Sequence, residues 1–106
     1  LINQETYKKL TIEADEEFKN LSTNQLKEKD INGITLLERL LLEILHFDAT
    51  RKHLDVKNAT LCSGSRHSDG SIPYVNWRSV VSKLDVYWYQ PGSFNYFLRA
   101  RVVVSL

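Results

Sequence analysis

The sequence predicts an α+β domain in which helices pack on a small, twisted antiparallel sheet with long loops. A chain of 106 residues with 42% apolar and 25% charged side chains has the length and composition of one globular domain. Helix-type spacing of apolar residues is confined to the first half. Strand-type alternation appears only in the second half, where 8 of the 11 aromatic residues lie between Tyr74 and Phe97.

The two halves also differ in charge. Residues 1–55 contain 8 Lys or Arg and 11 Asp or Glu, whereas residues 56–106 contain 6 and 2. The whole chain has a net charge of only +1, so no bulk charge attracts nucleic acid or an anionic membrane. The single cysteine, Cys62, excludes an internal disulfide and a cysteine zinc cage. No apolar run approaches the ~20 residues of a membrane helix, and no signal peptide is recognisable, so we expect no membrane insertion and assign no compartment.

Two segments before residue 33 differ in periodicity. Between residues 4 and about 20, apolar side chains recur every three or four positions, which predicts an amphipathic helix. Its apolar stripe would consist of Tyr7, Leu10, Ala14, Phe18 and Leu21. Residues 22–32 are polar and fit either a second short helix or a loop.

The clearest helix signal begins at Thr35. Thr35 is a typical N-cap residue and Glu38 follows three positions later, so the two predict a capping box that satisfies two backbone amides. The helix is expected to reach about Phe47 and to turn Glu38, Arg39 and Glu43 toward water. Its predicted buried face consists of Leu36, Leu37, Leu40, Leu41, Ile44 and Leu45.

Residues 84–89 alternate strictly, which predicts a half-buried strand. The expected buried side carries Leu84, Val86 and Trp88. The expected exposed side carries Asp85, Tyr87 and Tyr89. Residues 63–71 are predicted to form a Ser- and Gly-rich loop, and residues 90–93 a turn.

Residues 98–106 predict a second strand. Ala100, Val102 and Val104 would face one way, and Arg99, Arg101 and Val103 the other. We expect this strand to pair with residues 84–89 as an antiparallel hairpin across a long aromatic loop.

Aromatic side chains gather on the predicted exposed side of residues 84–89 and in the loop that follows. This cluster either packs against the rest of the domain or forms a binding surface. Tyr- and Ser-rich loops suit binding because Tyr offers a large contact area at low entropic cost, while Ser and Asn adapt their hydrogen bonds. The binding interpretation predicts that four side chains are clustered and solvent-accessible, namely Tyr87, Phe94, Tyr96 and Phe97. It also predicts that Trp77 and Trp88 are buried.

Four segments resemble, in their order, the variable proteins of diversity-generating retroelements. They are TLLERLLLE (residues 35–43), HLDVKNATLCSGSR (53–66), PYVNW (73–77), and KLDVYWYQPG (83–92) running on to LRARVVVS (98–105). Together they span residue 35 to the end of the sequence. The C-terminal domain of this family has a C-type lectin fold of the formylglycine-generating-enzyme type, and its variable region lies at the C-terminus.

The resemblance implies a diversified face carried by a fixed scaffold. In this family, adenines of a template are copied with errors, so Asn-type codons diversify to residues that include Tyr, Ser, Asp, Phe, Val and Arg but not Trp or Lys. The implied ligand-binding residues are Tyr74, Asn76, Arg78, Val80, Val81, Asp85, Tyr87, Ser93, Phe94, Tyr96 and Phe97. The implied scaffold residues are Trp77, Leu84, Val86, Trp88, Arg99 and Arg101. For Val80 and Val81, a place in the core is the competing interpretation.

The resemblance also implies the organisation and role of the whole chain. Residues 1–106 would form one C-type lectin-like domain, with a helical part at 1–33 and a variable-region part at 72–106. The function would be non-enzymatic recognition of a protein or other macromolecule on a target surface, in a prokaryotic or viral setting. Formylglycine-generating enzymes use a pair of cysteines, which this chain lacks.

Two other functions are considered. The tripeptide Gln90-Pro91-Gly92 resembles the Gln-Pro-Asp of calcium-dependent lectins but lacks the last oxygen ligand. Gln90, Asn95 and Asp85 alone do not provide the roughly six to eight oxygens that calcium needs. The second alternative is a structural or phage-associated assembly domain that packs its aromatic side chains on a neighbour.

The histidines and the cysteine show no catalytic or metal-binding pattern. His46, His53 and His67 lack metal-ligand spacing. We expect His53 to be a hydrogen-bonded structural residue and Cys62 to be a small buried apolar one. The sequence therefore predicts no catalytic residue, no metal and no cofactor.

Arginines near the aromatic residues allow one further interpretation. Arg66, Arg78, Arg99 and Arg101 could stack on single-stranded bases. Pairing of Arg99 and Arg101 with the acidic helix surface is the preferred interpretation, and no nucleic-acid partner is expected.

Overall fold

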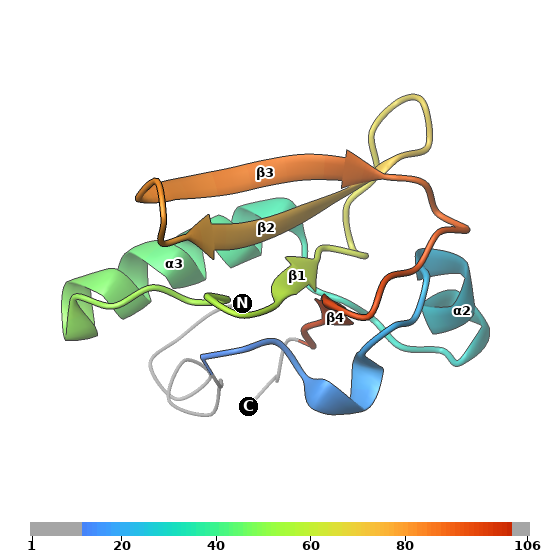
Figure 1. Cartoon of the computed structure of the whole chain (residues 1–106). Helices are drawn as coiled ribbons and strands as arrows, with labels where there is room; N and C mark the ends of the chain where they lie inside the picture. Colours follow the sequence, from blue (N-terminus) through green and yellow to red (C-terminus); the bar gives the residue numbers. More distant parts are fainter. Residues whose placement is uncertain (1–11, 103–106) are drawn as a thin grey trace.

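The computed structural model describes residues 12–102 and has an α+β fold in which two α-helices pack against a small mixed sheet (Figure 1). The helical elements are η1 (Glu16–Phe18), α2 (Thr23–Glu28) and α3 (Leu36–Thr50). The strands are β1 (Ala59–Leu61), β2 (Ile72–Arg78), β3 (Lys83–Tyr89) and β4 (Leu98–Ala100). The α+β class is thus confirmed. No helix among residues 12–102 combines the length and apolarity needed to cross a membrane.

The four strands lie in the order β3-β2-β1-β4. Strand β2 is antiparallel to both of its neighbours, whereas β1 and β4 run parallel, so the expected purely antiparallel sheet is wrong. The predicted hairpin between residues 84–89 and 98–106 is also wrong, because β3 and β4 lie at opposite edges. Instead β3 pairs with β2 over seven residues across the tight turn at 79–82. Closing this short loop costs less chain entropy than closing the long aromatic one.

Residues 12–20 do not form the amphipathic helix that the periodicity predicts for residues 4 to about 20. Residues 1–11 lie outside the described residues, and residues 12–20 contain only the short 3-10 turn η1. Here the backbone pairs with β4 instead: Asp15 N–H donates to the Ala100 carbonyl at 3.1 Å and Asn20 N–H to the Leu98 carbonyl at 3.0 Å. Tertiary hydrogen bonds thus override the helical periodicity.

Residues 22–32 contain the short helix that the sequence left open. Ser22 and Gln25 form a capping box at the start of α2. The helix buries Leu26, which packs with Leu61, Ile72 and Ala100 on one side of the sheet. A second cluster contains Leu42 of α3 and Val75 of β2. Because Ile72 and Val75 are three residues apart in one strand, the two clusters lie on opposite sides of the sheet.

Helix α3 begins as predicted but faces the other way. Thr35 and Glu38 form the expected capping box, and the helix continues three residues past the expected end. The residues that it buries are Arg39, Leu42, Glu43 and His46. Most of the predicted buried face is exposed, namely Leu37, Leu41, Ile44 and Leu45. The expectation that Arg39 and Glu43 face water is therefore wrong.

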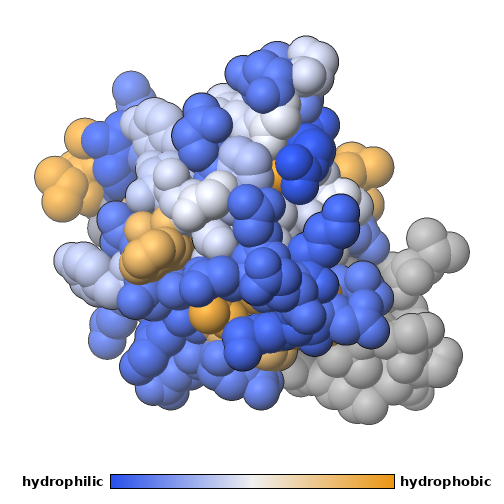
Figure 2. All heavy atoms as spheres, turned by 90° about the vertical axis from the view of Figure 1, so that its right-hand side faces the viewer, coloured by the Kyte–Doolittle hydropathy of each residue, from blue (hydrophilic) through white to orange (hydrophobic). Residues whose placement is uncertain are grey.

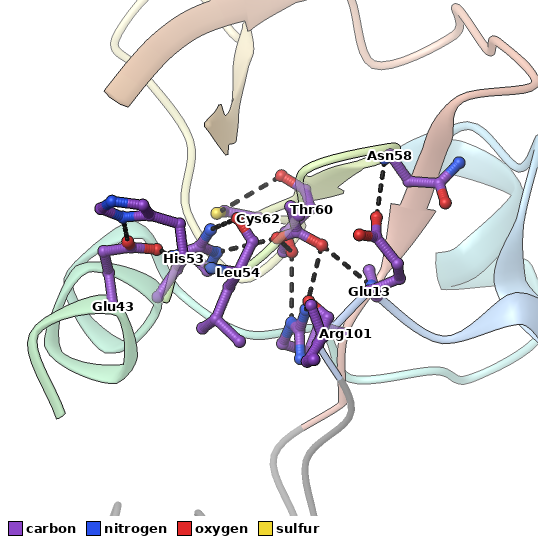
Figure 3. A network of polar contacts seen from close by, with 12 residues as sticks. Glu13, Glu43, His53, Leu54, Asn58, Thr60, Cys62 and Arg101 are labelled. Atoms are coloured by element: carbon purple, nitrogen blue, oxygen red, sulfur yellow. Dashed lines mark hydrogen bonds and ion pairs between the residues drawn. The ribbon is translucent and has the colours of Figure 1, made fainter. Parts of the chain in front are cut away.

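A buried ionic network explains this orientation (Figure 3). Asp55 is fully buried and its carboxylate binds two fully buried arginines, Arg39 through Nε at 3.0 Å and Arg101 through Nη2 at 3.0 Å. Thr60 donates its hydroxyl to Asp55 and accepts from Arg101. Arg39 also binds Glu43 at 3.0 Å. The network joins α3, β1 and the chain after β4, so the charged side of the helix lies inward.

The network also corrects the expectation for the C-terminal arginines. Arg101 binds the buried Asp55 and not the acidic helix surface. Arg99 is half-buried and donates from Nη1 to the Ala14 carbonyl at 3.2 Å. The Arg101 guanidinium is fully buried and cannot stack on bases, whereas Arg99 lines a surface pocket together with the acidic side chains of residues 13 and 15–17.

Cys62 is fully buried beside Ile34, Leu42 and Val75, as expected. Burial raises the pKa of its thiol from the ordinary 9.0 to about 12. Between these two values the unfolded chain loses the thiol proton and the folded chain keeps it. Stability conferred by the neutral thiol is therefore present below the unfolded pKa and is lost as the pH rises toward the folded one.

We predict that the free energy of unfolding falls more steeply above the ordinary thiol pKa in the wild-type protein than in Cys62→Ala. Lysines and tyrosines titrate in both proteins, so the difference between the two slopes isolates the thiol. Urea unfolding at several alkaline pH values measures it. Equal slopes would show that the thiolate forms as readily in the folded chain as in the unfolded one.

Candidate binding face of the β2–β3 hairpin

Strands β2 and β3 direct alternate side chains to two sides of the sheet. Residue pairs opposite each other share a side, and the register pairs Tyr74 with Tyr87 and Asn76 with Asp85. The intervening pairs, such as Val75 with Val86, point to the side where α3 packs. We call the side away from α3 the hairpin face and define it by Tyr74, Asn76, Arg78, Asp85 and Tyr87 of the strands together with Tyr96 and Phe97 of the following loop.

Tyr74 is the centre of an aromatic cluster on the hairpin face. Its ring centroid lies 5.7 Å from Tyr87, 5.7 Å from Phe97 and 6.0 Å from Tyr89. Tyr96 extends the cluster, 6.4 Å from Phe97. These separations suit edge-to-face packing of aromatic rings. Burial, followed by the nearby Tyr87, raises the pKa of Tyr74, so its phenol stays a neutral hydrogen-bonding group at neutral pH.

A charged pair lies next to the aromatic cluster. Arg78 donates from Nε to Asp85 Oδ2 and from Nη2 to Asp85 Oδ1 at 3.3 Å. Nη2 also lies 3.5 Å from the Tyr87 hydroxyl. Arg78 covers Asp85, which is why Asp85 is buried although it lies on the predicted side. Both oxygens of the Asp85 carboxylate are thus engaged by the Arg78 guanidinium. This pairing disfavours Asp85 as a calcium ligand, which the alternative function of a calcium-dependent lectin would require.

The remaining predicted binding residues surround this face at its turn and its loop. Val80 and Val81 occupy the β2–β3 turn, and Val80 is 98% exposed, so a place in the core is excluded for both. Phe94 and Tyr96 are exposed, whereas Ser93 and Phe97 are half-buried. Tyr87, Phe94 and Tyr96 are thus accessible as predicted, and Phe97 is partly so. The predicted clustering holds for Tyr87, Tyr96 and Phe97, which ring contacts join through Tyr74, but among the described residues no ring contact joins Phe94 to them.

The expected scaffold is only partly buried. Trp77 is half-buried and its ring stacks on His53 with centroids 3.5 Å apart. Leu84 packs against the core, but Trp88 is 47% exposed and Val86 is exposed as well. The prediction that Trp88 is buried is wrong, because β3 is an edge strand and α3 does not extend over its C-terminal half. Trp88 contacts the ring of His67 instead, at 4.9 Å.

The histidines have structural partners. His53 Nδ1 lies 2.6 Å from Glu43 Oε2, and its ring lies between Phe47 and Trp77, which confirms the hydrogen-bonded role expected for it. Burial lowers the pKa of His46. Within residues 12–102, no three His, Cys, Asp or Glu side chains are grouped as metal ligands would be.

One member of the aromatic cluster, Tyr89, is predicted on the exposed side of its strand but is absent from the implied ligand-binding residues. Tyr89 lies opposite Ile72 and contacts Tyr74, so it belongs to the same side as Tyr87. The period-two alternation already placed it there. Its half-buried ring packs edge-to-face against Tyr74, which in turn packs against the core cluster that contains Leu26 and Ile72.

No protein-family model matches the chain, and comparisons with curated proteins and with solved structures find no match either. A function for this chain therefore follows from its sequence and from the geometry of the hairpin face.

Proposed function

We propose that this chain is a non-enzymatic binding protein that recognises a protein or other macromolecule through the hairpin face. We further propose that it is a variable protein of a diversity-generating retroelement with a C-type lectin-like domain. The observation that carries the proposal is a separation of residue types. All the strand residues implied to vary project to one side of β2 and β3, and the core partners of α3 project to the other.

This separation is what a diversified protein requires. Side chains that change between copies must lie outside the core, because core substitutions of the wrong volume destabilise the fold. Most of the residues implied to vary meet this condition, although Tyr74 also packs against the core cluster that contains Leu26 and Ile72. Ten of the eleven are exposed or half-buried. The eleventh, Asp85, is buried and is hydrogen-bonded to Arg78, which is itself one of the eleven.

The composition of the face also suits protein recognition. Tyrosine and phenylalanine bury a large area with few rotatable bonds, and Arg is the charged residue most enriched at binding hot spots. The face combines these with the Asn76 amide at its centre, between Tyr74 and Arg78 on β2. A flat aromatic surface with several hydrogen-bonding groups fits a macromolecular surface better than a small molecule.

A matched pair of libraries tests the proposal. In the first, the eleven implied binding positions are randomised together with Asn-type codon products. In the second, as control, buried positions of the sheet such as Val75, Ile72 and Leu61 are randomised with the same codons. We expect most members of the first library to fold, as measured by protease resistance on a display system, and most of the second to be digested.

Selection of the folded members against unrelated protein targets then tests binding. We expect binders whose sequences converge at Tyr87, Tyr96 and their neighbours. If the first library is digested as completely as the second, the face is part of the folding core and the proposal fails. In the native gene, the proposal also requires a near-identical copy of the 3′ coding segment that differs at adenines and lies beside a reverse-transcriptase gene.

A further inference from the structure

The surface of α3 carries an apolar stripe that no described residue covers. Leu37, Leu41, Ile44 and Leu45 recur at helical spacing and are 67%, 45%, 64% and 43% exposed. By contrast, hydrophilic residues cover most of the side of the molecule that carries α2, where apolar residues form separate small patches (Figure 2). An exposed row of large aliphatic side chains on one helix is typical of an interaction site.

A pocket lies beside the C-terminal half of the same stripe. It has a volume of about 360 Å³ and is formed between α3 and the hairpin. Its apolar walls are Ile44 and Phe47 of α3 and Trp77 and Leu84 of the strands, with His53 between the two aromatic rings. The volume is enough for a leucine side chain and its neighbours. The most exposed member of the stripe, Leu37, lies at the other end of the helix.

We infer that two copies of this chain pair through α3 in antiparallel orientation. In this arrangement Leu37 of each copy enters the pocket at the C-terminal end of the other copy's helix. Each copy offers a projecting side chain at one end of α3 and a pocket at the other, so one two-fold axis satisfies both contacts at once, as an isologous interface requires. The axis then passes close to Ile44.

Charge favours the same orientation. Glu38 lies in the first turn of α3. At the other end Asp48 lies in the last turn, but Arg51 and Lys52 follow it, so two cations outweigh one carboxylate there. Antiparallel pairing brings the acidic end of one helix to the basic end of the other, and it also opposes the two helix dipoles. Parallel pairing would place the two Glu38 carboxylates together and would align the two helix dipoles.

The inference goes beyond the proposed function and does not depend on it. Helix α3 lies on one side of the sheet and the hairpin face on the other. Pairing through α3 therefore leaves both hairpin faces accessible, and a dimer could bind a target with two faces at once.

Sedimentation velocity over a range of concentrations tests the pairing. We expect the wild-type chain to pass from monomer to dimer, and both Leu37→Glu and Ile44→Glu to weaken the dimer at least tenfold. Both side chains are exposed in the monomer, so the variants should keep their far-ultraviolet circular dichroism. Val56→Glu is the matched control, because Val56 is exposed to the same extent as Leu41, 44% against 45%, but lies outside α3.

Single cysteines test the orientation. Ile44→Cys, close to the axis, should form a covalent dimer on mild oxidation. Leu37→Cys should not, because the two copies of residue 37 would lie roughly 20 Å apart along the helices. The native Cys62 is fully buried and does not interfere. Efficient cross-linking at residue 37 but not at 44 would overturn the antiparallel arrangement.

Two results would overturn the pairing itself. One is a wild-type chain that stays monomeric at every concentration. The other is a dimer that Leu37→Glu leaves intact, which would mean that another surface pairs. Neither result bears on the hairpin face, which the display libraries test separately.

Discussion

Replacing Asp55 with asparagine is expected to lower the free energy of unfolding by about 3–5 kcal/mol. Asp55 is fully buried and is the carboxylate that both Arg39 and Arg101 bind, each at 3.0 Å. Both arginine side chains are themselves inaccessible to water. Removing the negative charge leaves two buried, positively charged guanidinium groups without the carboxylate that balances them. The expected loss of stability therefore exceeds that of the same substitution at an exposed ion pair.

The matched control is Asp30→Asn. Asp30 is exposed, and both aspartates have left-handed backbones, with φ of 58° at Asp30 and 54° at Asp55, so the substitution has the same backbone consequence at both sites. Urea unfolding followed by tryptophan fluorescence measures both variants, and the control should change stability by less than about 0.5 kcal/mol. If the two variants were equally stable, the network would not hold α3 to the sheet.

A milder variant keeps the test informative if Asp55→Asn does not fold. Thr60→Val removes one hydroxyl that donates to Asp55 and accepts from Arg101 at 3.2 Å, and it preserves the shape of the side chain. The expected loss is about 1–2 kcal/mol, because buried hydrogen bonds to charged groups are lost without a change in charge.

The elements with local signals could be predicted from the sequence. The capping box at Thr35, the loop at 63–71, the strand at 84–89 and the turn at 90–93 each depend on residues within a few positions of one another. The face shared by Asp85 and Tyr87 follows from the same local alternation. These predictions agree with the structure because no distant residue is needed to specify them.

The pairing of strands could not be predicted in the same way. Strand β4 has three residues and lies parallel to β1, nearly 40 positions away in the chain. No local pattern specifies that contact. The choice of β2 as the partner of β3 depends on the short turn around Val80, whose two valines indicated a core segment as readily as a turn.

The burial of the scaffold shows another limit of alternation. Alternation predicts which side chains share a face but not how far the next layer extends over it. Val75 in the central strand β2 is fully buried, whereas Val86 opposite it at the sheet edge is exposed. For the same reason Trp88, which shares the face of Val86, is not part of the core.

The orientation of α3 is where composition was most misleading. The helix has more leucines on its outer side than on its inner side, so amphipathicity alone turns it the wrong way. Residues after the helix select its inner side. Asp55 accepts a hydrogen bond from Arg39, and His53 pairs with Glu43. A polar helix face is stable inside a protein only where such partners exist.

A pair of adjacent alanine substitutions distinguishes the two orientations. Leu42→Ala is expected to lower the free energy of unfolding by about 2–5 kcal/mol, because Leu42 is fully buried between Ile34, Cys62 and Val75. Leu41→Ala should lower it by less than about 1 kcal/mol, because Leu41 is 45% exposed in the single chain and lies outside both core clusters. Both substitutions place alanine inside the same helix, so their effects on helix propensity are equal.

The measurement is urea unfolding at a protein concentration low enough to keep the chain monomeric, so that pairing through α3 does not stabilise Leu41. The orientation predicted from amphipathicity alone gives the reverse order, with Leu41 costly and Leu42 nearly neutral. A large loss at Leu41 and a small one at Leu42 would therefore show that α3 buries its leucine stripe. The same result would also mean that the apolar surface required by the proposed dimer is not exposed. A large loss only at Leu42 supports both the ionic network and the accessible stripe, because one rotation of the helix determines them together.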